Sequence, residues 1–344
     1  MSTGAKKTIL SRQIRKEMVN SDQVERTTLS FYKYVKIDDP VKVKEELLKV
    51  WSELGCLGRI YLAKEGINAQ MNVPTQNFAQ FESYMRTHEL FRDVPFKIAV
   101  EEGNAPSFYK LSVRVRDKIV ADGLDDDSFD VTDTGEYLTA AEFNSYVDDP
   151  EAVVVDMRNS YESEVGHFEN AVKPDVDTFR EELNLAPKLL RVHKNKKIAL
   201  YCTGGIRCEK ASAWLKHNGF ENVRHLKGGI IDYKHQVEKE NLPNRFKGKN
   251  FVFDERLGER IGEEIISTCH LCKESKSDTH YHCKFEPCHV LYIGCDECVA
   301  KKRGYCSYSC QALDQLPAKI KKLYARYRNQ YFKPAQFRKC KLRN

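Results

Sequence analysis

The sequence YCTGGIRCEKASAWL, residues 201–215, connects an expected buried strand to an expected helix. The apolar run KKIALYC, residues 196–202, is typical of a strand inside a parallel sheet. Gly204 and Gly205 allow the sharp turn that follows this strand. Backbone N–H groups of such a turn surround the Cys202 sulfur at the positive end of the helix. Because both effects favour the nucleophilic thiolate, Cys202 is the predicted catalytic residue.

The length of this turn separates two kinds of chemistry. Only four residues, Thr203–Ile206, lie between Cys202 and Arg207. Cysteine phosphatases place one residue more there, which widens the turn enough to hold a phosphate. The shorter turn resembles that of rhodaneses, which carry a terminal sulfur on the cysteine as a persulfide. We therefore expect sulfur chemistry on Cys202, with Arg207 stabilising the anion and Thr203, Gly204, Gly205 and Ile206 forming the loop.

Cys208 is a second thiol beside this loop, in the first turn of the expected helix. From there it can resolve an oxidised or persulfidated Cys202 as a disulfide. The alternative is a small residue that packs on the helix, and the sequence leaves both open.

Residues 135–243 alternate short apolar strands with helices, a pattern that predicts a parallel sheet with ligands at the strand C-termini. Strands are expected at 153–158, 196–202 and before 229, and helices near 140–147, 177–190 and 207–218. The segment VVVDMRNSYESEVGHFENAV, residues 153–172, resembles the first rhodanese signature, and HLKGGIIDY, residues 225–233, resembles the closing one. By this resemblance the scaffold residues are Asp156, Arg158, His167, Gly228 and Gly229.

Residues 26–121 have the order β-α-β-β-α-β, which predicts a ferredoxin-like (acylphosphatase-like) sandwich. An extension, residues 1–25, precedes it, and an acidic linker, residues 122–134, follows it. Phe31, Tyr32 and Tyr34 on the first strand either stack on RNA bases or divide between the core and an ordinary surface.

Residues 244–310 contain eight of the twelve cysteines. Close Cys pairs predict one or two tetrahedral thiolate zinc sites; an iron–sulfur cluster and disulfides formed on isolation are the alternatives. Which four cysteines share a metal stays open, and four histidines in or beside the run can replace a thiolate. The candidate ligands are Cys269, Cys272, Cys283, Cys288, Cys295, Cys298, Cys306 and Cys310, with His270, His280, His282 and His289 as substitutes.

The remaining residues, 311–344, form a basic tail, helical near 314–330. Residues 301–344 hold thirteen Lys and Arg against one acidic residue, Asp314. Interleaved aromatic residues suit a phosphate backbone with unstacked bases, although a solvated tail is the alternative. These aromatic residues are Tyr324, Tyr327, Tyr331, Phe332 and Phe337.

Neither a membrane-length apolar run, which needs about 18 residues, nor a secretory signal is evident. We therefore expect a cytoplasmic protein. In a reducing compartment, paired cysteines indicate metal or redox chemistry more than structural disulfides.

Several motifs outside the catalytic turn extend the resemblance to a whole family. Together with the turn they look like the tRNA uridine hydroxylase family, a group that contains a rhodanese domain. The motifs are SFYKYV (30–35), YLAKEGINAQMNVP (61–74), RDKIVADG (116–123), MRNSYESEVGHFENA (157–171), YCTGGIRCEKASAW (201–214) and GKNFVFDER (248–256).

The resemblance implies an oxygen-dependent oxidoreductase that converts the wobble uridine of tRNA to 5-hydroxyuridine. Cys202 would be its catalytic cysteine, passing through a persulfide, and the anticodon loop its target. A sulfane-sulfur donor protein or a reductase would be a further partner. A plain sulfurtransferase is the alternative, and a non-enzymatic RNA-binding module is a third. The sandwich and the basic Cys-rich end are superfluous for transfer to a small molecule, and we therefore favour the hydroxylase.

Overall fold

A computed structural model describes residues 12–22, 24–101, 106–125 and 128–331. The described residues form two compact units. The first contains the chain up to Ala121 together with Phe253–Arg256, and the second contains the rest. Among these residues, we find no helix with the length and apolarity needed to cross a bilayer.

The first unit is a sheet of five strands in the order β4-β1-β3-β2-β5. β5 is parallel to β2, and the other neighbours are antiparallel. This confirms the predicted ferredoxin-like sandwich, with β5 added at one edge. The elements are α1 (Arg12–Ser21), β1 (Arg26–Tyr34), α2 (Pro40–Glu53), β2 (Leu57–Ala63), β3 (Gly66–Pro74), a 3₁₀ turn (Thr75–Asn77), α3 (Phe78–Thr87), β4 (Lys97–Ile98) and β5 (Leu111–Val115).

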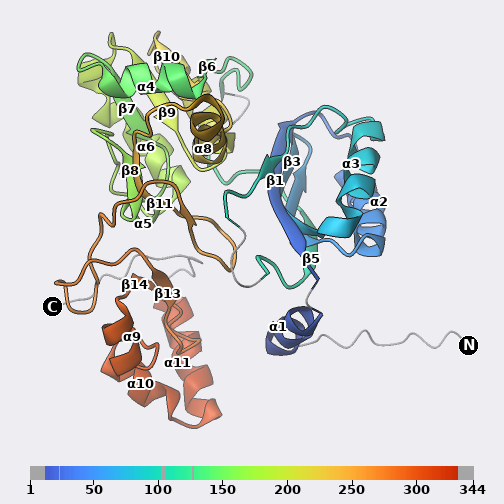
Figure 1. Cartoon of the computed structure of the whole chain (residues 1–344), viewed down its shortest axis with the longest axis vertical. Helices are drawn as coiled ribbons and strands as arrows, with labels where there is room; N and C mark the ends of the chain where they lie inside the picture. The colour runs from blue at the N-terminus through green and yellow to red at the C-terminus, as the bar shows by residue number, and fades with distance from the viewer. Residues whose placement is uncertain (1–11, 23, 102–105, 126–127, 332–344) are drawn as a thin grey trace, which may run out of the picture. The chain divides into compact units, whose positions relative to one another are not determined.

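Alternation along the strands gives this sheet one apolar face. Phe31, Ile60 and Met71 are buried on it, together with Trp51 of α2 and Phe81 of α3. Both helices lie on the same side of the sheet (Figure 1). The residues between the buried ones therefore point to the opposite face.

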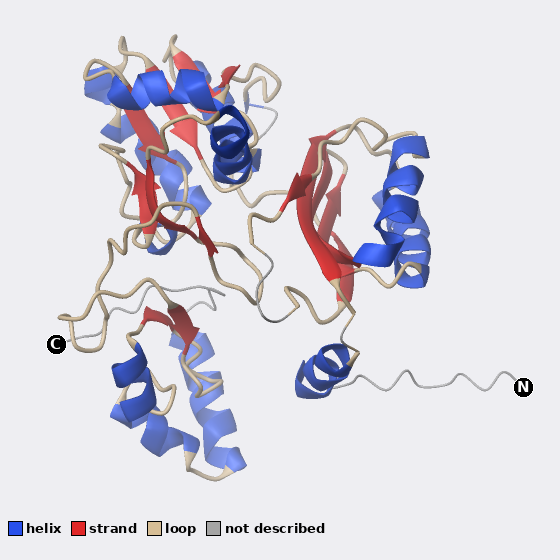
Figure 2. Cartoon of the chain, viewed as in Figure 1, coloured by secondary structure: helices blue, strands red, loops and turns tan. Residues whose placement is uncertain are grey.

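The second unit is built on a parallel sheet in the order β6-β10-β9-β7 (Figure 2). This is the predicted rhodanese-type α/β arrangement, and α4 contacts α8 while α6 contacts α7. Its elements are β6 (Glu136–Leu138), α4 (Ala140–Asp148), β7 (Val153–Asp156), α5 (Ser160–Ser163), β8 (Gly166–Phe168), α6 (Phe179–Leu189), β9 (Ile198–Tyr201), α7 (Ile206–His217), β10 (Val223–Leu226) and α8 (Gly229–Glu240).

Three features of this unit differ from the sequence expectations. β8 was not expected as a strand, and it pairs with β11 (Phe246–Asn250), which also pairs with the short β12 (Glu259–Arg260). The helix α8 was not expected. Asp122, at the start of the predicted linker, is fully buried and lies 3.5 Å from Lys210 Nζ.

The C-terminal part of the unit has a small core. Four of the seven buried residues in this cluster are cysteines, so apolar burial supplies little of its stability. Tyr324 of α11 packs on Phe285 with ring centroids 5.4 Å apart. Phe332, Phe337 and Cys340 lie outside the described residues. The elements are β13 (His280–His282), β14 (Leu291–Ile293), α9 (Asp296–Lys301), α10 (Tyr308–Asp314) and α11 (Ala318–Tyr331).

Candidate active site and metal centres

Cys202 lies immediately after β9, in the turn that leads to α7. The N–H of Gly205 donates to its sulfur at 3.1 Å, and the N–H groups of Arg207 and Cys208 also donate to it. Gly205 has φ +98°, a conformation that residues with a side chain rarely adopt. The glycine therefore permits the turn that aims three backbone donors at one sulfur.

Helix α8 holds the outer side of this turn. Its first N–H groups donate to the loop carbonyls, from Ile230 to Cys202 at 3.0 Å and from Ile231 to Thr203 at 3.2 Å. A Cβ on Gly229 would lie 2.6 Å from the Cys202 carbonyl oxygen. The close approach of α8 to the loop thus requires glycine at 229. The hydrogen bonds from α8 hold the loop carbonyls away from the Cys202 sulfur, while the loop N–H groups point towards it.

The environment of Cys202 favours its thiolate. Burial alone raises the pKa of the thiol, because the anion loses its hydration. A hydrogen bond from the Cys208 thiol, the charge of Arg207 and the backbone donors outweigh this cost and lower the pKa of Cys202 to about 6. The sulfur is therefore largely ionised at neutral pH.

Arg207 acts on this sulfur while its side chain is held by a buried carboxylate. Its two terminal nitrogens donate to Glu162 at 2.7 and 2.9 Å, a bidentate pair. The Thr203 hydroxyl lies 3.4 Å from Arg207 and 3.5 Å from Glu162. Arg207 therefore stabilises the Cys202 anion by its charge and its backbone N–H.

Glu182 of α6 is a further acidic group in these surroundings. It is fully buried, and neither carboxylate oxygen has a hydrogen-bond partner among the described residues. Burial raises the pKa of Glu182 well above its ordinary value; Arg207 opposes this, and the charges of Asp156, Glu162 and Cys202 reinforce it. We therefore expect Glu182 to be protonated at neutral pH.

Cys208 has the opposite character to Cys202. Burial, together with the hydrogen bond it donates to Cys202, raises the pKa of Cys208 well above its ordinary value. One sulfur is thus an anion and its neighbour a neutral thiol. A pair of this kind can exchange a proton or form a disulfide.

Three of the residues expected as scaffold lie in β7, just after it and in β8. Asp156 and Arg158 are fully buried and form an ion pair at 2.7 Å, and the Tyr201 hydroxyl donates to Asp156 at 2.7 Å. Arg158 also donates to the Gly166 carbonyl at 2.7 Å. His167 lies 2.8 Å from the Ser163 carbonyl, and burial lowers its pKa. Contacts of this kind are structural.

Comparison with known proteins covers most of the chain. Residues 26–119 match the UPF0176 acylphosphatase-like domain, 139–236 the rhodanese-like domain and 247–311 the rhodanase C-terminal domain. A tRNA uridine(34) hydroxylase of Leptospira interrogans is 50% identical over 314 residues, 91% of this chain and 85% of that protein. That of Salmonella typhi is 53% identical over 286 residues, 83% and 81% of the two chains.

The chain belongs to the tRNA uridine(34) hydroxylase family. The resemblance seen in its motifs is confirmed, and so is the prediction that it is an enzyme of this class. In this member of the family, the cysteines beyond the rhodanese-like domain form two further groups.

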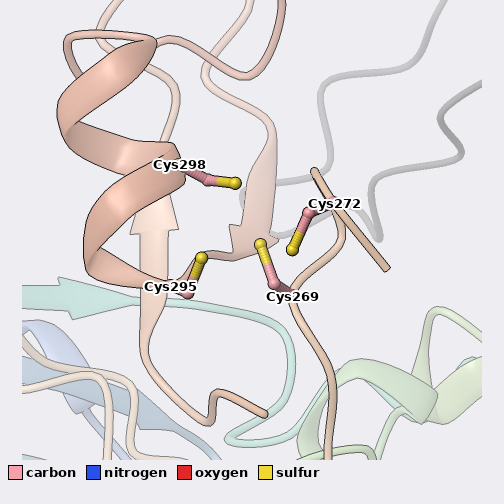
Figure 3. Close-up of side chains that lie close together, drawn as sticks. All are labelled: Cys269, Cys272, Cys295 and Cys298. Atoms are coloured by element: carbon pink, nitrogen blue, oxygen red, sulfur yellow. The ribbon is translucent and has the colours of Figure 1, made fainter. Parts of the chain in front are cut away.

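The first group brings together Cys269, Cys272, Cys295 and Cys298, whose sulfurs all lie within 4.8 Å of one another. Figure 3 shows the two pairs facing each other, one from the start of α9 and one from an opposite loop. Four convergent thiols are the donor set of a structural zinc site. This group can therefore hold a metal ion.

The second group consists of Cys283, Cys288, Cys306 and Cys310, all buried and also within 4.8 Å. Cys306 Sγ lies 3.8 Å from Cys288 Sγ and 3.6 Å from Cys310 Sγ. Four sulfurs at about 2.3 Å from a tetrahedral zinc ion are about 3.8 Å apart, whereas a disulfide needs about 2.05 Å. These distances fit a shared metal ion.

Neither group includes any of the four histidines that could have replaced a thiolate. His270, for example, lies with its Nε2 2.8 Å from Glu164. The groups alternate along the chain, so that the first and third close pairs share one site and the second and fourth share the other.

The roles of Glu162 and Glu182 were not predicted from the sequence. Glu162 had a weak signal, since Asn159 and Glu162 form a capping box at the start of α5. That pattern predicts a helix start, and nothing in it indicates an arginine partner 45 residues further along. Glu182 has the ordinary appearance of a polar residue in an amphipathic helix.

Proposed function

We propose that this chain hydroxylates the uridine at position 34 of tRNA, with Cys202 as its catalytic cysteine. The observation that supports this most is the thiolate turn itself, intact in a chain about half identical to hydroxylases of the family over most of its length. The short loop also suits a persulfide on Cys202. Its N–H groups would then stabilise the negative charge of the outer sulfur.

Cys208 allows the turn to supply the electrons that hydroxylation by molecular oxygen consumes. Hydroxylation by molecular oxygen places one oxygen atom on the base and needs two electrons and two protons to turn the other into water. Oxidation of the Cys202 thiolate and the Cys208 thiol to a disulfide releases two electrons and one proton, and the second proton comes from water. A reductase or a small thiol then restores the pair. In this proposal Cys208 resolves the oxidised state of Cys202.

The helix α11 is the proposed contact for the tRNA backbone at the C-terminal end. Lys319, Lys322 and Arg326 are exposed on it. The same helix is attached to the small core through Tyr324, which holds the charges on a fixed surface. Phosphate contacts of this kind make affinity fall with salt.

We also propose that both cysteine groups hold structural zinc. Two groups of four sulfurs, each within 4.8 Å of one another in a segment with a small apolar core, would need a metal to fold. Metal analysis should find about two zinc ions per chain. A purified protein with neither zinc nor iron would refute this proposal.

The decisive experiment is nucleoside mass spectrometry on tRNA from cells that lack this gene, complemented with wild type, Cys202→Ser or Cys208→Ser. We expect only wild type to restore 5-hydroxyuridine fully, with Cys202→Ser inactive. If 5-hydroxyuridine persists without this protein, even after any parallel route has been deleted, the hydroxylase proposal is wrong. The short loop then favours the sulfurtransferase, and a thiolated product becomes the one to measure.

A further inference from the structure

The polar face of the first unit's sheet carries an ordered array of side chains. Paired residues on neighbouring strands point to the same face. One row across the sheet is Tyr32, Asn68, Tyr61 and Arg114, each directly opposite the next. The adjacent row is Ser30, Gln70, Arg59 and Ser112.

This face is separate from the apolar face. Phe31, between the two rows on β1, is 1% exposed and packs with Trp51 of α2. The helices α2 and α3 both cover that apolar side (Figure 1). At one end of the polar face Thr28 and Asn72 are buried against Ser107, which places the loop after β4 at its border.

Cations and aromatic rings lie together on this face. Lys97 Nζ lies 4.7 Å from the centre of the Tyr32 ring, and the Arg116 guanidinium lies 5.8 Å from that of Tyr61. Tyr32 also contacts Tyr34 edge-on, with ring centroids 6.2 Å apart. Such rings provide flat surfaces on which unpaired bases stack.

The positive charges at the β2–β5 edge of this face are not neutralised within the unit. Arg59, Lys110, Arg114 and Arg116 have no ion-pair partner in the part of the chain that the structure describes. Burial lowers the pKa of Lys110, and repulsion from Arg15, Arg114 and Arg59 lowers it further. A cluster of cations that repel one another is stabilised when an anion binds.

We propose that this face, centred on Tyr61 and Arg114, binds the unpaired nucleotides of an RNA loop. The tyrosine rings stack on bases, and Arg114, Arg116 and Lys110 neutralise phosphates. The amides of Asn68 and Gln70 are held within the chain, since Gln70 donates to Asn68 at 3.3 Å and Asn68 to the Ile119 carbonyl at 3.1 Å. The inference rests on the proposed tRNA substrate and adds the surface that recognises its single-stranded part.

Two matched double substitutions distinguish binding at this face from general electrostatic attraction to RNA. Arg114→Gln/Arg116→Gln removes two exposed cations from the sheet face, and Lys42→Gln/Lys49→Gln removes two exposed cations from α2 of the same unit. Tyr61→Ala removes the ring, and Tyr61→Phe retains it. The full-length, metal-loaded protein is titrated against a synthetic anticodon stem-loop and against the same RNA annealed to its complement, by fluorescence anisotropy at several salt concentrations.

Tyr61→Ala should weaken binding of the stem-loop roughly fivefold to 100-fold and change duplex affinity by less than about twofold. Tyr61→Phe should bind the stem-loop like wild type. Arg114→Gln/Arg116→Gln should weaken binding and lower the salt slope by about 1 to 2, with the α2 pair unchanged. Three results would overturn the proposal. The two double variants could lose equal affinity, Tyr61→Ala and the sheet double variant could both bind like wild type, or wild type could show no preference for the stem-loop over the duplex.

The two proposals fail separately. If these variants bind poorly but wild type forms no 5-hydroxyuridine, the RNA surface stands and the hydroxylase proposal fails. If wild type modifies tRNA and the sheet variants bind and modify it normally, the hydroxylase stands and this surface is refuted.

Discussion

The chain uses cysteine in two different ways, and the regions that do so are stabilised by different forces. At Cys202 the backbone of a close-packed α/β domain directs three N–H groups to one sulfur. Between Cys269 and Cys310 eight sulfurs converge in two groups around a small core. The first region prepares one reactive anion, whereas the second gathers many anions that only a cation can hold together.

The comparison shows what makes a cysteine reactive. A thiolate is stabilised either by fixed backbone dipoles, which leave its lone pairs free for chemistry, or by a metal, which occupies them. The loop of Cys202 owes its shape to Gly205, to Gly229 and to the ion pair of Arg207 with Glu162. None of these residues belongs to either cysteine group. The two regions should therefore respond independently to metal removal and to mutation.

Metal removal should have the largest effect and should be confined to one region. Structural zinc contributes about 10–16 kcal/mol in small zinc domains at neutral pH. A strong chelator should therefore abolish hydrogen-exchange protection in 269–310 while β7, β9 and α7 keep theirs. Loss of protection in both regions would mean that the catalytic fold also depends on metal.

Asp156→Asn should have the next largest effect, within the other region. It leaves the Arg158 guanidinium buried without its charge partner, a change that costs about 3–5 kcal/mol. Hydrogen exchange of the β7 and β9 amides in zinc-loaded protein measures this loss of stability. Glu151→Gln, which breaks an exposed pair with Lys196, should cost less than about 1 kcal/mol. Similar values for the two variants would contradict the assigned scaffold role.

Glu182→Gln should show the smallest effect, and one that depends on pH. The folded pKa of Glu182 is raised, so the wild-type contribution is complete below the unfolded pKa of about 4.5 and is lost as pH rises towards the folded value. Glutamine does not titrate. The variant should therefore gain stability over wild type above that pH, by at most about 1.4 kcal/mol per pH unit. A stability difference that is constant with pH would show that Glu182 is ionised in the folded protein.

The sequence predicted the strand, the turn at Cys202 and the following helix well, because their determinants are local. Cys202, the glycines and the start of α7 fall within a few residues, and one strand and one helix place them. Alternation and helical spacing likewise predicted the sandwich and the parallel sheet. On the first strand the same alternation assigns Phe31 to the core and Tyr32 to the other face.

What the sequence could not supply depends on contacts between distant residues. Glu162 holds Arg207 from α5, and Glu182 of α6 interacts electrostatically with Cys202. β8 pairs with β11, which follows α8 in the chain. The cysteine spacings also allowed several groupings. The fold of β13, β14 and α9 decides the grouping, because it places Cys269 and Cys272 beside Cys295 and Cys298.

The most direct test of the central claim is the titration of Cys202. The ultraviolet absorbance of the thiolate is followed with pH in zinc-loaded wild type and Cys202→Ser, and the difference between them isolates one sulfur. Because backbone donors, Arg207 and Cys208 lower the pKa of Cys202 to about 6, the difference should show a midpoint near that pH. A midpoint near the ordinary value of 9.0 would mean that the turn does not prepare a nucleophile, and the account of this site would be wrong.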